Sequence, residues 1–137
     1  MPKADLLNQF IKTLKGFDKV VKNVKFLKGD KGNCVATVKI QEDNLNPMGG
    51  LHGGFSATLV DSISSFGLMT HEPWATPSVS VNINLTYLKG AKVGEEITII
   101  SNVLRAGKTM AYLDVELRNA ADQLLVKAEH TKFKMGA

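Results

Sequence analysis

The chain has 137 residues, of which 44% are hydrophobic and 22% charged, which predicts one globular domain over residues 1–137 and excludes a disordered chain. Its single cysteine, Cys34, excludes an intrachain disulfide framework and a cysteine-rich zinc site. The net charge is +4, but residues 1–30 hold seven lysines and three aspartates, so the whole surplus belongs to this segment and, without a nucleic-acid motif, predicts no nucleic-acid partner.

The first predicted element is a helical leader over residues 1–19. Its apolar residues recur at helical spacing and its lysines lie largely off that stripe, as in an amphipathic helix with a solvated face. Gly16 is the predicted end of the helix. The segment lacks a signal-peptide core, and no run is apolar enough for a membrane span. We therefore expect a cytoplasmic protein, with the mitochondrion as a second location. The apolar stripe comprises Leu6, Leu7, Phe10, Ile11, Leu14 and Phe17.

Two short strands and a buried helix follow. Residues 20–27 and 34–40 have strand-like patterns, and the composition of residues 29–33 indicates a turn between them. After an Asn- and Gly-rich loop over 42–53, residues 54–71 predict a helix of about five turns. Its apolar residues do not keep to one stripe, which predicts a helix that is buried nearly all round.

The rest of the chain predicts four strands, over residues 79–87, 96–104, 109–117 and 124–133. Their short connections force neighbouring strands to be antiparallel, because a parallel pair needs a longer crossover. A flat sheet cannot cover every face of one helix, whereas a strongly curved sheet can wrap around it. We therefore predict an α+β hotdog fold. Its sheet edges need cover, so we expect at least a dimer.

Asp61 is the first candidate for catalysis, because it is the single charge in the predicted buried helix. A carboxylate in such a place is costly unless it is paired. It could be a structural acid bonded to a neighbouring serine, such as Ser64 or Ser65, or a general base or nucleophile. The residues alone leave both interpretations open.

The second candidate is the segment over 46–54, Asn-Pro-Met-Gly-Gly-Leu-His-Gly-Gly, which runs into the start of the same helix. Paired glycines let a substrate approach the backbone, and the first turn of a helix offers N–H groups without intrahelical partners. This is a suitable place to stabilise a carbonyl oxygen as it becomes negative. A plain Gly-rich turn is the alternative, and His52 could be an acid–base group or could only orient the loop.

The spacing of these candidates constrains any mechanism. Gly53 and Asp61 are eight positions apart, which is about 12 Å along a helix. A base must come within about 3 Å of the atom it serves, or act through one water. One helix therefore cannot easily supply both groups to one substrate. A two-fold dimer that places Asp61 of one subunit opposite Gly53 of the other would solve this.

Other polar residues carry weaker signals. Gly107–Thr109 is not part of a P-loop, because Asn102 stands where that motif needs a glycine. Arg105 and Lys108 on this tight turn could meet phosphates or form a solvated hairpin tip. Cys34 is predicted to lie in the core. The histidines are scattered and no metal-ligand set is visible, so we expect no metal and no organic cofactor.

The motifs resemble the hotdog-fold acyl-CoA thioesterases of the PaaI-like group. The resemblance lies in Leu51–Gly54 followed by Ala57–Asp61, and it extends through Ser78–Tyr87 and Gly107–Thr109 to His130–Lys132. It implies hydrolysis of medium- to long-chain acyl-CoA to free fatty acid and CoA, as in fatty acid metabolism. It also implies a homo-oligomer, a dimer of dimers or homotetramer.

The same resemblance implies the roles of individual residues. Gly53, through its N–H, and Asn46 would polarise the thioester carbonyl. Asp61 of the facing subunit would activate a water that Ser80 orients, and His52 would support the loop. The substrate-binding region for CoA would comprise Tyr87 with Arg105, Ala106, Gly107, Lys108, Thr109 and Met110.

Two alternatives to hydrolysis remain. The first is a thioester dehydratase or hydratase of the same fold, which would change the acyl chain and leave CoA attached. The second is a non-catalytic module that binds acyl-CoA or lipid.

Overall fold

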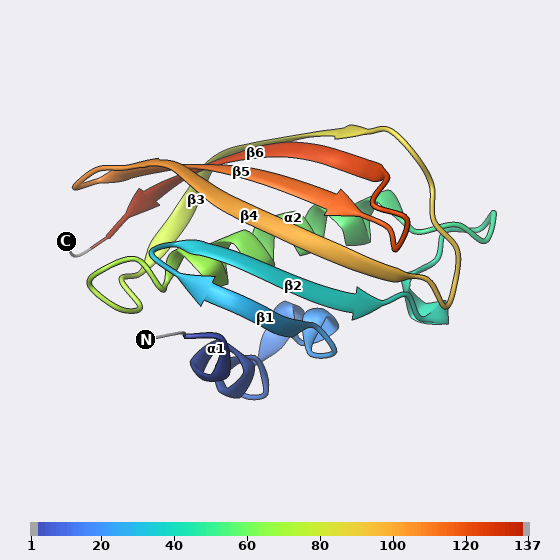
Figure 1. The fold of residues 1–137 in the computed structure, drawn as a ribbon, viewed down its shortest axis with the longest axis horizontal. Coiled ribbons are helices and arrows are strands. Elements are labelled where there is room, and N and C mark those ends of the chain that lie inside the picture. The colour runs from blue at the N-terminus through green and yellow to red at the C-terminus, as the bar shows by residue number, and fades with distance from the viewer. Residues whose placement is uncertain (1–2, 136–137) are drawn as a thin grey trace.

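The fold is one antiparallel sheet of six strands that curves around the helix α2 (Figure 1). The computed structural model describes residues 3–135. Its elements are α1 (Ala4–Ile11), the 3₁₀-helix η1 (Gly16–Val21), β1 (Lys25–Asp30), β2 (Asn33–Lys39), the 3₁₀-helix η2 (Glu42–Asn44), α2 (Gly53–Leu68), β3 (Ser78–Tyr87), β4 (Glu96–Ala106), β5 (Met110–Arg118) and β6 (Leu124–Lys134). The predicted hotdog arrangement is therefore confirmed.

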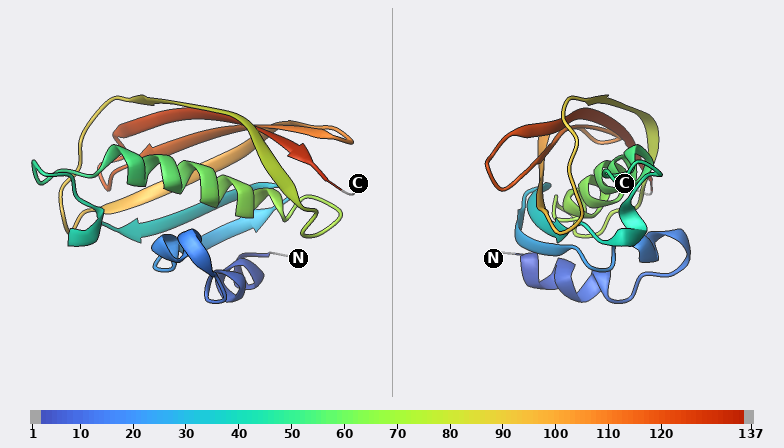
Figure 2. Two further views of the ribbon diagram at one scale, coloured as in Figure 1. Left: turned by 180° about the vertical axis from the view of Figure 1, so that it is seen from behind. Right: turned by 90° about the vertical axis from the view of Figure 1, so that its right-hand side faces the viewer.

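The strands lie in the order β1-β2-β4-β5-β6-β3, and every neighbouring pair is antiparallel, as the short connections predicted. β3 is the exception to sequential order, because the chain crosses from β2 through α2 to the far edge of the sheet. Figure 2 shows α2 lying across the concave face. β1 and β3 are thus the two edges, and each has one neighbouring strand in the described part of the chain.

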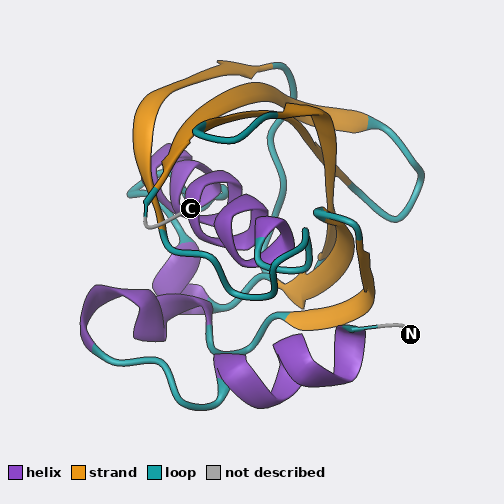
Figure 3. Cartoon of the chain, turned by 90° about the vertical axis from the view of Figure 1, so that its left-hand side faces the viewer, coloured by secondary structure: helices purple, strands orange, loops and turns teal. Residues whose placement is uncertain are grey.

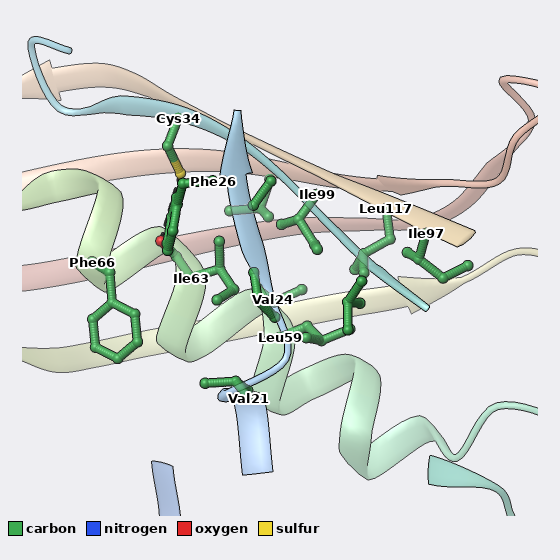
Figure 4. Packing of buried hydrophobic residues seen from close by; sticks show 14 of the residues in the cluster. Val21, Val24, Phe26, Cys34, Leu59, Ile63, Phe66, Ile97, Ile99 and Leu117 are labelled. Carbon is green, nitrogen blue, oxygen red and sulfur yellow. Dashed lines mark hydrogen bonds between the residues drawn. The ribbon is translucent and has the colours of Figure 1, made fainter. Parts of the chain in front are cut away.

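The core lies between α2 and the concave face of the sheet. Leu59 and Ile63, on the sheet-facing side of α2, are fully buried. They meet inward-facing residues of β4 such as Ile97 and Ile99 (Figure 4). Inward-facing and outward-facing residues alternate along β5 and β6, so each strand gives one face to this core.

The N-terminal segment differs from the prediction. α1 ends at Ile11 rather than near Gly16, and the predicted strand over 20–27 begins only at Lys25. Gly16, with a φ of 67°, starts η1 instead, and the tertiary contacts of η1 override the strand preference of its β-branched residues. Val21 is buried in the core, and Asp18 accepts a hydrogen bond of 3.0 Å from Ser62 of α2.

Figure 3 shows the two short N-terminal helices outside the sheet. α1 packs against β1, whereas η1 contacts α2 on a side that the sheet leaves open. Asn8 of α1 accepts a hydrogen bond from the N–H of Phe26 and donates one to its carbonyl, which ties α1 to the edge strand. Within residues 3–135, no helix has the length and hydropathy needed to cross a bilayer.

Candidate active site

The glycine-rich segment becomes the N-terminus of α2. His52 is the N-cap, and its Nδ1 accepts a hydrogen bond of 2.8 Å from the N–H of Gly54. The side chain of His52 thus caps the helix through Nδ1, which leaves Nε2 outside this hydrogen bond, and its role in the site stays a prediction. The N–H of Gly53 belongs to the first turn, where no intrahelical acceptor exists, and within residues 3–135 no other acceptor pairs with it.

Both glycines of this turn have close side-chain neighbours. A Cβ at Gly53 would lie 3.3 Å from the ring of Tyr87, whose hydroxyl donates a hydrogen bond of 2.9 Å to the carbonyl of Gly53. A Cβ at Gly54 would lie 2.9 Å from the ring of His52. Glycine thus lets the end of β3 and the capping histidine close around the helix start while leaving the Gly53 N–H free.

Asn46 lies in a small loop that folds back against the start of α2. The N–H of His52 donates to the carbonyl of Asn44, and Leu45 and Leu51 form a β-bridge. The side-chain oxygen of Asn46 accepts hydrogen bonds from the N–H groups of Met48 and Gly50, at 2.9 and 3.1 Å. This side-chain oxygen holds the loop, while its amide Nδ2 has no acceptor within the described residues and can donate to a ligand.

Asp61 lies in the third turn of α2, and its carboxylate is exposed rather than buried. Its side chain is 54% exposed, because one stripe of α2 that includes Gly54 and Asp61 is covered by neither the sheet nor η1. The prediction of a helix buried nearly all round is wrong for this stripe. Ser64 and Ser65 do not bond the carboxylate either. The hydroxyl of Ser65 donates to the backbone carbonyl of Asp61 at 2.7 Å, and the hydroxyl of Ser64 lies 3.3 Å from the same carbonyl.

The carboxylate instead faces a serine–histidine pair. The hydroxyl of Ser80, on β3, lies 3.5 Å from Oδ1 of Asp61 and 2.7 Å from Nε2 of His130, on β6. The other ring nitrogen of His130, Nδ1, lies 2.8 Å from the hydroxyl of Ser64. A chain of hydrogen-bonding groups therefore runs from the buried side of α2 through His130 and Ser80 to Asp61.

Two buried basic groups lie behind this carboxylate. The side chain of His130 is fully buried, and burial together with the nearby charge of Lys132 lowers the pKa of His130 to about 4. The ring is therefore neutral at pH 7. Lys132 is also buried and donates a hydrogen bond of 2.7 Å to Ser65, and burial lowers its pKa from the ordinary value.

Sequence reasoning named Asp61 and Ser80 but assigned no role in the site to His130 or Lys132. One signal could have found them. The inward-facing positions of β6 run through Val126 and Ala128 to His130 and Lys132. Two polar residues that continue an apolar alternation toward the predicted central helix indicate a polar patch on the concave face.

The predicted CoA-binding residues do not come together in one chain. Tyr87 pairs with Val126 of β6, whereas Met110, the first residue of β5, pairs with Phe133. These two β6 residues are seven positions apart, which is about 23 Å along a strand. Tyr87 therefore lies at the Gly53 end of the molecule and the turn over 105–110 lies at the opposite end. Arg105 lines a cavity of about 710 Å³ there, together with Lys3 and Lys31.

Cys34 has no part in this site. Its thiol is buried in the core, where burial raises its pKa to about 12, so it is not a nucleophile. Between residues 3 and 135, no group of three or more His, Cys, Asp or Glu side chains is arranged to hold a metal ion.

Known proteins resemble the chain over most of its length. The family model described as the thioesterase superfamily matches residues 48–126. Acyl-coenzyme A thioesterase 13 of Mus musculus is 43% identical over 118 residues, which cover 85% of this chain and 84% of that protein. The crystal structure of thioesterase superfamily member 2 from Mus musculus has a TM-score of 0.88 at 40% identity, covering 95% of this chain and 96% of that one. The resemblance to hotdog-fold acyl-CoA thioesterases that the sequence motifs indicated is therefore confirmed.

A less similar protein has a crystal structure that was determined with coenzyme A. The crystal structure of a hypothetical thioesterase from Streptococcus pneumoniae TIGR4 with coenzyme A has a TM-score of 0.79 at 30% identity. The similarity covers 84% of this chain and 88% of that one. These likenesses extend well beyond the site itself and include the curved sheet and its central helix.

Proposed function

The chain belongs to the thioesterase superfamily, and we propose that it hydrolyses acyl-CoA thioesters at a site shared by two subunits. One observation carries the proposal. A free N–H at the start of α2 and an exposed carboxylate in its third turn lie on one helix, about 12 Å apart along its axis. They are a carbonyl polariser and a base, the two groups that thioester hydrolysis needs.

The first step is polarisation of the thioester carbonyl. Its oxygen accepts hydrogen bonds from the N–H of Gly53 and from the side-chain amide of Asn46. As water attacks, negative charge develops on this oxygen, where the N-terminal end of the helix dipole also favours it. Because the Asn46 side-chain oxygen is already bonded to two N–H groups of its loop, the amide is held in place before substrate arrives.

The second step is attack by water. Asp61 removes a proton from a water molecule, whose oxygen forms a bond to the carbonyl carbon. When the tetrahedral intermediate collapses, the carbon–sulfur bond breaks and the CoA sulfur takes a proton from the Asp61 carboxylic acid. Ser80 lies beside Oδ1 and positions the water, and the neutral ring of His130 fixes the Ser80 hydroxyl.

The two groups come from different subunits. The exposed stripe of α2 and the neighbouring edge strand β3 would face a second copy, which brings its Asp61 to the Gly53 of the first. CoA would then extend from Tyr87 of one subunit to the turn over 105–110 of another, whose Arg105 and Lys108 suit its phosphates. We propose that such dimers pair further into a homotetramer.

Hydrolysis of an acyl-CoA series tests the activity. Release of free CoA from medium- and long-chain substrates is expected, and its loss by at least about 100-fold is expected in Asp61→Asn. Intact CoA on a changed acyl chain would instead favour the dehydratase or hydratase. Binding of acyl-CoA without turnover in the wild type would favour the non-catalytic module.

Mixed oligomers test the sharing of the site. Neither Asp61→Ala nor Asn46→Ala homodimers should turn over substrate well. A hybrid of the two has one site with both groups intact, so about half of the activity of a wild-type dimer should return. If hybrids stay as inactive as the parents, each site is built within one subunit.

We place the enzyme in the cytoplasm, with the mitochondrion as the second location. Fractionation of cells that express a tagged chain, followed by immunoblotting of cytosolic and mitochondrial fractions, tests this assignment.

A further inference from the structure

Lys132 is a buried cation without a paired anion. It lies on the concave face of β6 and is only 4% exposed. Its ammonium group donates a hydrogen bond of 2.7 Å to the hydroxyl of Ser65 on α2. Within residues 3–135 it forms no salt bridge, although a buried charge that lacks a partner is costly. An apolar side chain could fill the same space more cheaply, so the charge itself needs an explanation.

The charge of Lys132 lies beside the serine–histidine pair that faces Asp61. Lys132 pairs directly with Ser80 across the β3–β6 ladder, and it follows His130 by two positions. Because side chains two positions apart on a strand point to the same face, the ammonium group and the imidazole both lie against α2. Asp61 and Ser65 are neighbours on the surface of that helix, so the cation also lies near the carboxylate.

Two opposite charges therefore act on the ring of His130. Oδ1 of Asp61 lies 3.8 Å from Nε2 and favours the protonated ring, whereas the charge of Lys132 adds to burial in lowering the pKa of His130 to about 4. The charges of Asp61 and Asp18 in turn favour the ammonium form of Lys132 against its own burial. The hydrogen-bond and cross-strand neighbours of His130 are uncharged, namely Ser64 on α2, Ser80 and Ile83 on β3 and Leu113 on β5.

We propose that Lys132 is a positioning residue for the proposed base, and that its buried charge keeps the His130 ring neutral beside Asp61. The inference rests on the proposed thioesterase function and deepens it. An imidazolium ring 3.8 Å from Oδ1 would form an ion pair with the carboxylate, which would then be a weaker base toward water. Lys132 thus leaves the carboxylate available under mildly acidic conditions, where a histidine beside an aspartate would otherwise take up a proton.

The titration of His130 tests the charge effect without any measurement of activity. NMR follows the ring protons of the three histidines, and the signals that are missing in His130→Gln identify this ring. The wild-type ring should stay neutral down to about pH 5. In Lys132→Gln the pKa of His130 should rise toward the ordinary value of about 6.5, because a charge that opposed protonation is gone. Lys132→Arg keeps that charge and should keep the ring neutral.

Lys134→Gln is the matched control. Lys134 is also buried on the concave face of β6, but it lies two positions farther from His130. This variant removes the same charge from the same face of the strand, and the titration of His130 should stay close to that of the wild type.

The pH dependence of decanoyl-CoA hydrolysis tests the consequence for the base. The ratio of kcat/KM at pH 5.5 to kcat/KM at pH 8 should fall by about threefold or more in Lys132→Gln, because only the lower pH protonates the ring. In the His130→Gln background the same substitution should leave this ratio unchanged. An equal fall in that background would overturn the inference, because Lys132 would then act on Asp61 directly.

The remaining outcomes separate the two proposals. If the wild type releases CoA from no acyl-CoA, the thioesterase function fails, and the NMR titration still shows whether Lys132 keeps the ring neutral. If His130 titrates alike in the wild type and Lys132→Gln, or if Lys134→Gln shifts it equally, the inference is wrong. A loss of rate in Lys132→Gln that is the same at both pH values also contradicts it, since that loss indicates a structural role alone. Should Lys132→Gln fail to fold, Lys132→Met removes the charge, fills similar space and decides the question.

Discussion

A histidine that stays neutral beside a carboxylate orients its hydrogen-bond partners, whereas a histidine that transfers protons must change its charge. His130 is buried, its pKa is lowered to about 4, and both of its ring nitrogens already face serine hydroxyls. One ring nitrogen must carry a proton and the other must accept one. If Ser64 donates to Nδ1, then Nε2 donates to Ser80, and the Ser80 hydroxyl is left to donate toward Asp61. His130 is therefore a positioning residue for the proposed base.

The first prediction concerns this chain of hydrogen bonds. Ser80→Ala should lower kcat by about 10- to 100-fold with KM nearly unchanged, as expected for one lost hydrogen bond to a charged group. His130→Leu should cause a similar loss, and the double variant should lose little more, because both substitutions remove one function. His130→Gln, which keeps a neutral hydrogen-bonding side chain, should recover part of the rate. Losses that multiply in the double variant would contradict the relay.

The lowered pKa of His130 also predicts how stability depends on pH. Unfolded His130 takes up a proton near pH 6.5, whereas the folded ring does so only near pH 4. Between these values the unfolded state binds more protons, so the free energy of unfolding falls as the pH is lowered. The full contribution is about 3 kcal/mol. Urea unfolding from pH 7 to pH 4 should show a steeper loss in the wild type than in His130→Gln, and parallel curves would contradict the assignment.

At the scale of elements, α2 packs closely against β2 at Gly67. A Cβ at Gly67 would lie 2.5 Å from the thiol sulfur of Cys34 and 3.1 Å from its Cβ. No helical side chain larger than hydrogen fits against this residue of β2. The absence of a side chain at Gly67 therefore lets the C-terminal half of α2 lie close to β2.

A methyl group added at Gly67 should therefore lower the free energy of unfolding clearly. Gly67→Ala is expected to destabilise the fold by about 1–3 kcal/mol, because overpacking outweighs the better helix propensity of alanine. Cys34→Ala removes the sulfur that the new methyl group meets. The double variant should be less destabilised than the sum of the two single variants, as measured by urea unfolding. Additive losses would mean that α2 shifts elsewhere to accommodate the methyl group.

The periodicity of hydrophobic residues predicted the regular elements well. Any fold that buries one face of an element requires apolar residues with a period of two in a strand or 3.6 in a helix. The four C-terminal strands and α2 lie within a few residues of their predicted positions. The segment over 12–24 could not be predicted in this way. Its conformation depends on partners distant in sequence, such as the Ser62 hydroxyl bonded to Asp18. The exposure of Asp61 was missed for a related reason, since sequence does not show which stripe of a central helix the sheet leaves open.

At the scale of the whole molecule, the exposed stripe of α2 and the edge strand β3 are two neighbouring surfaces that nothing in the described part of the chain covers. β3 has no strand neighbour on its outer side in the described part of the chain, and it exposes apolar side chains there. Val79, Val81 and Tyr87 are 47%, 59% and 56% exposed. A long apolar edge of this kind promotes pairing with another chain. A second copy on this edge would cover the strand and stand beside Asp61 at the same time.

The last prediction links this assembly to catalysis. Val81→Asp places a charge at the proposed contact and should shift the protein toward monomers in light scattering, because a buried unpaired carboxylate is costly. If the site is shared, the monomer should also lose nearly all acyl-CoA hydrolysis, although none of the proposed catalytic residues has been replaced. Val93→Asp is the matched control, since Val93 is 51% exposed on the loop between β3 and β4 and should leave both assembly and rate unchanged. A monomeric Val81→Asp variant with the wild-type kcat would show that one subunit carries a complete site, and assembly would then have to serve stability rather than chemistry.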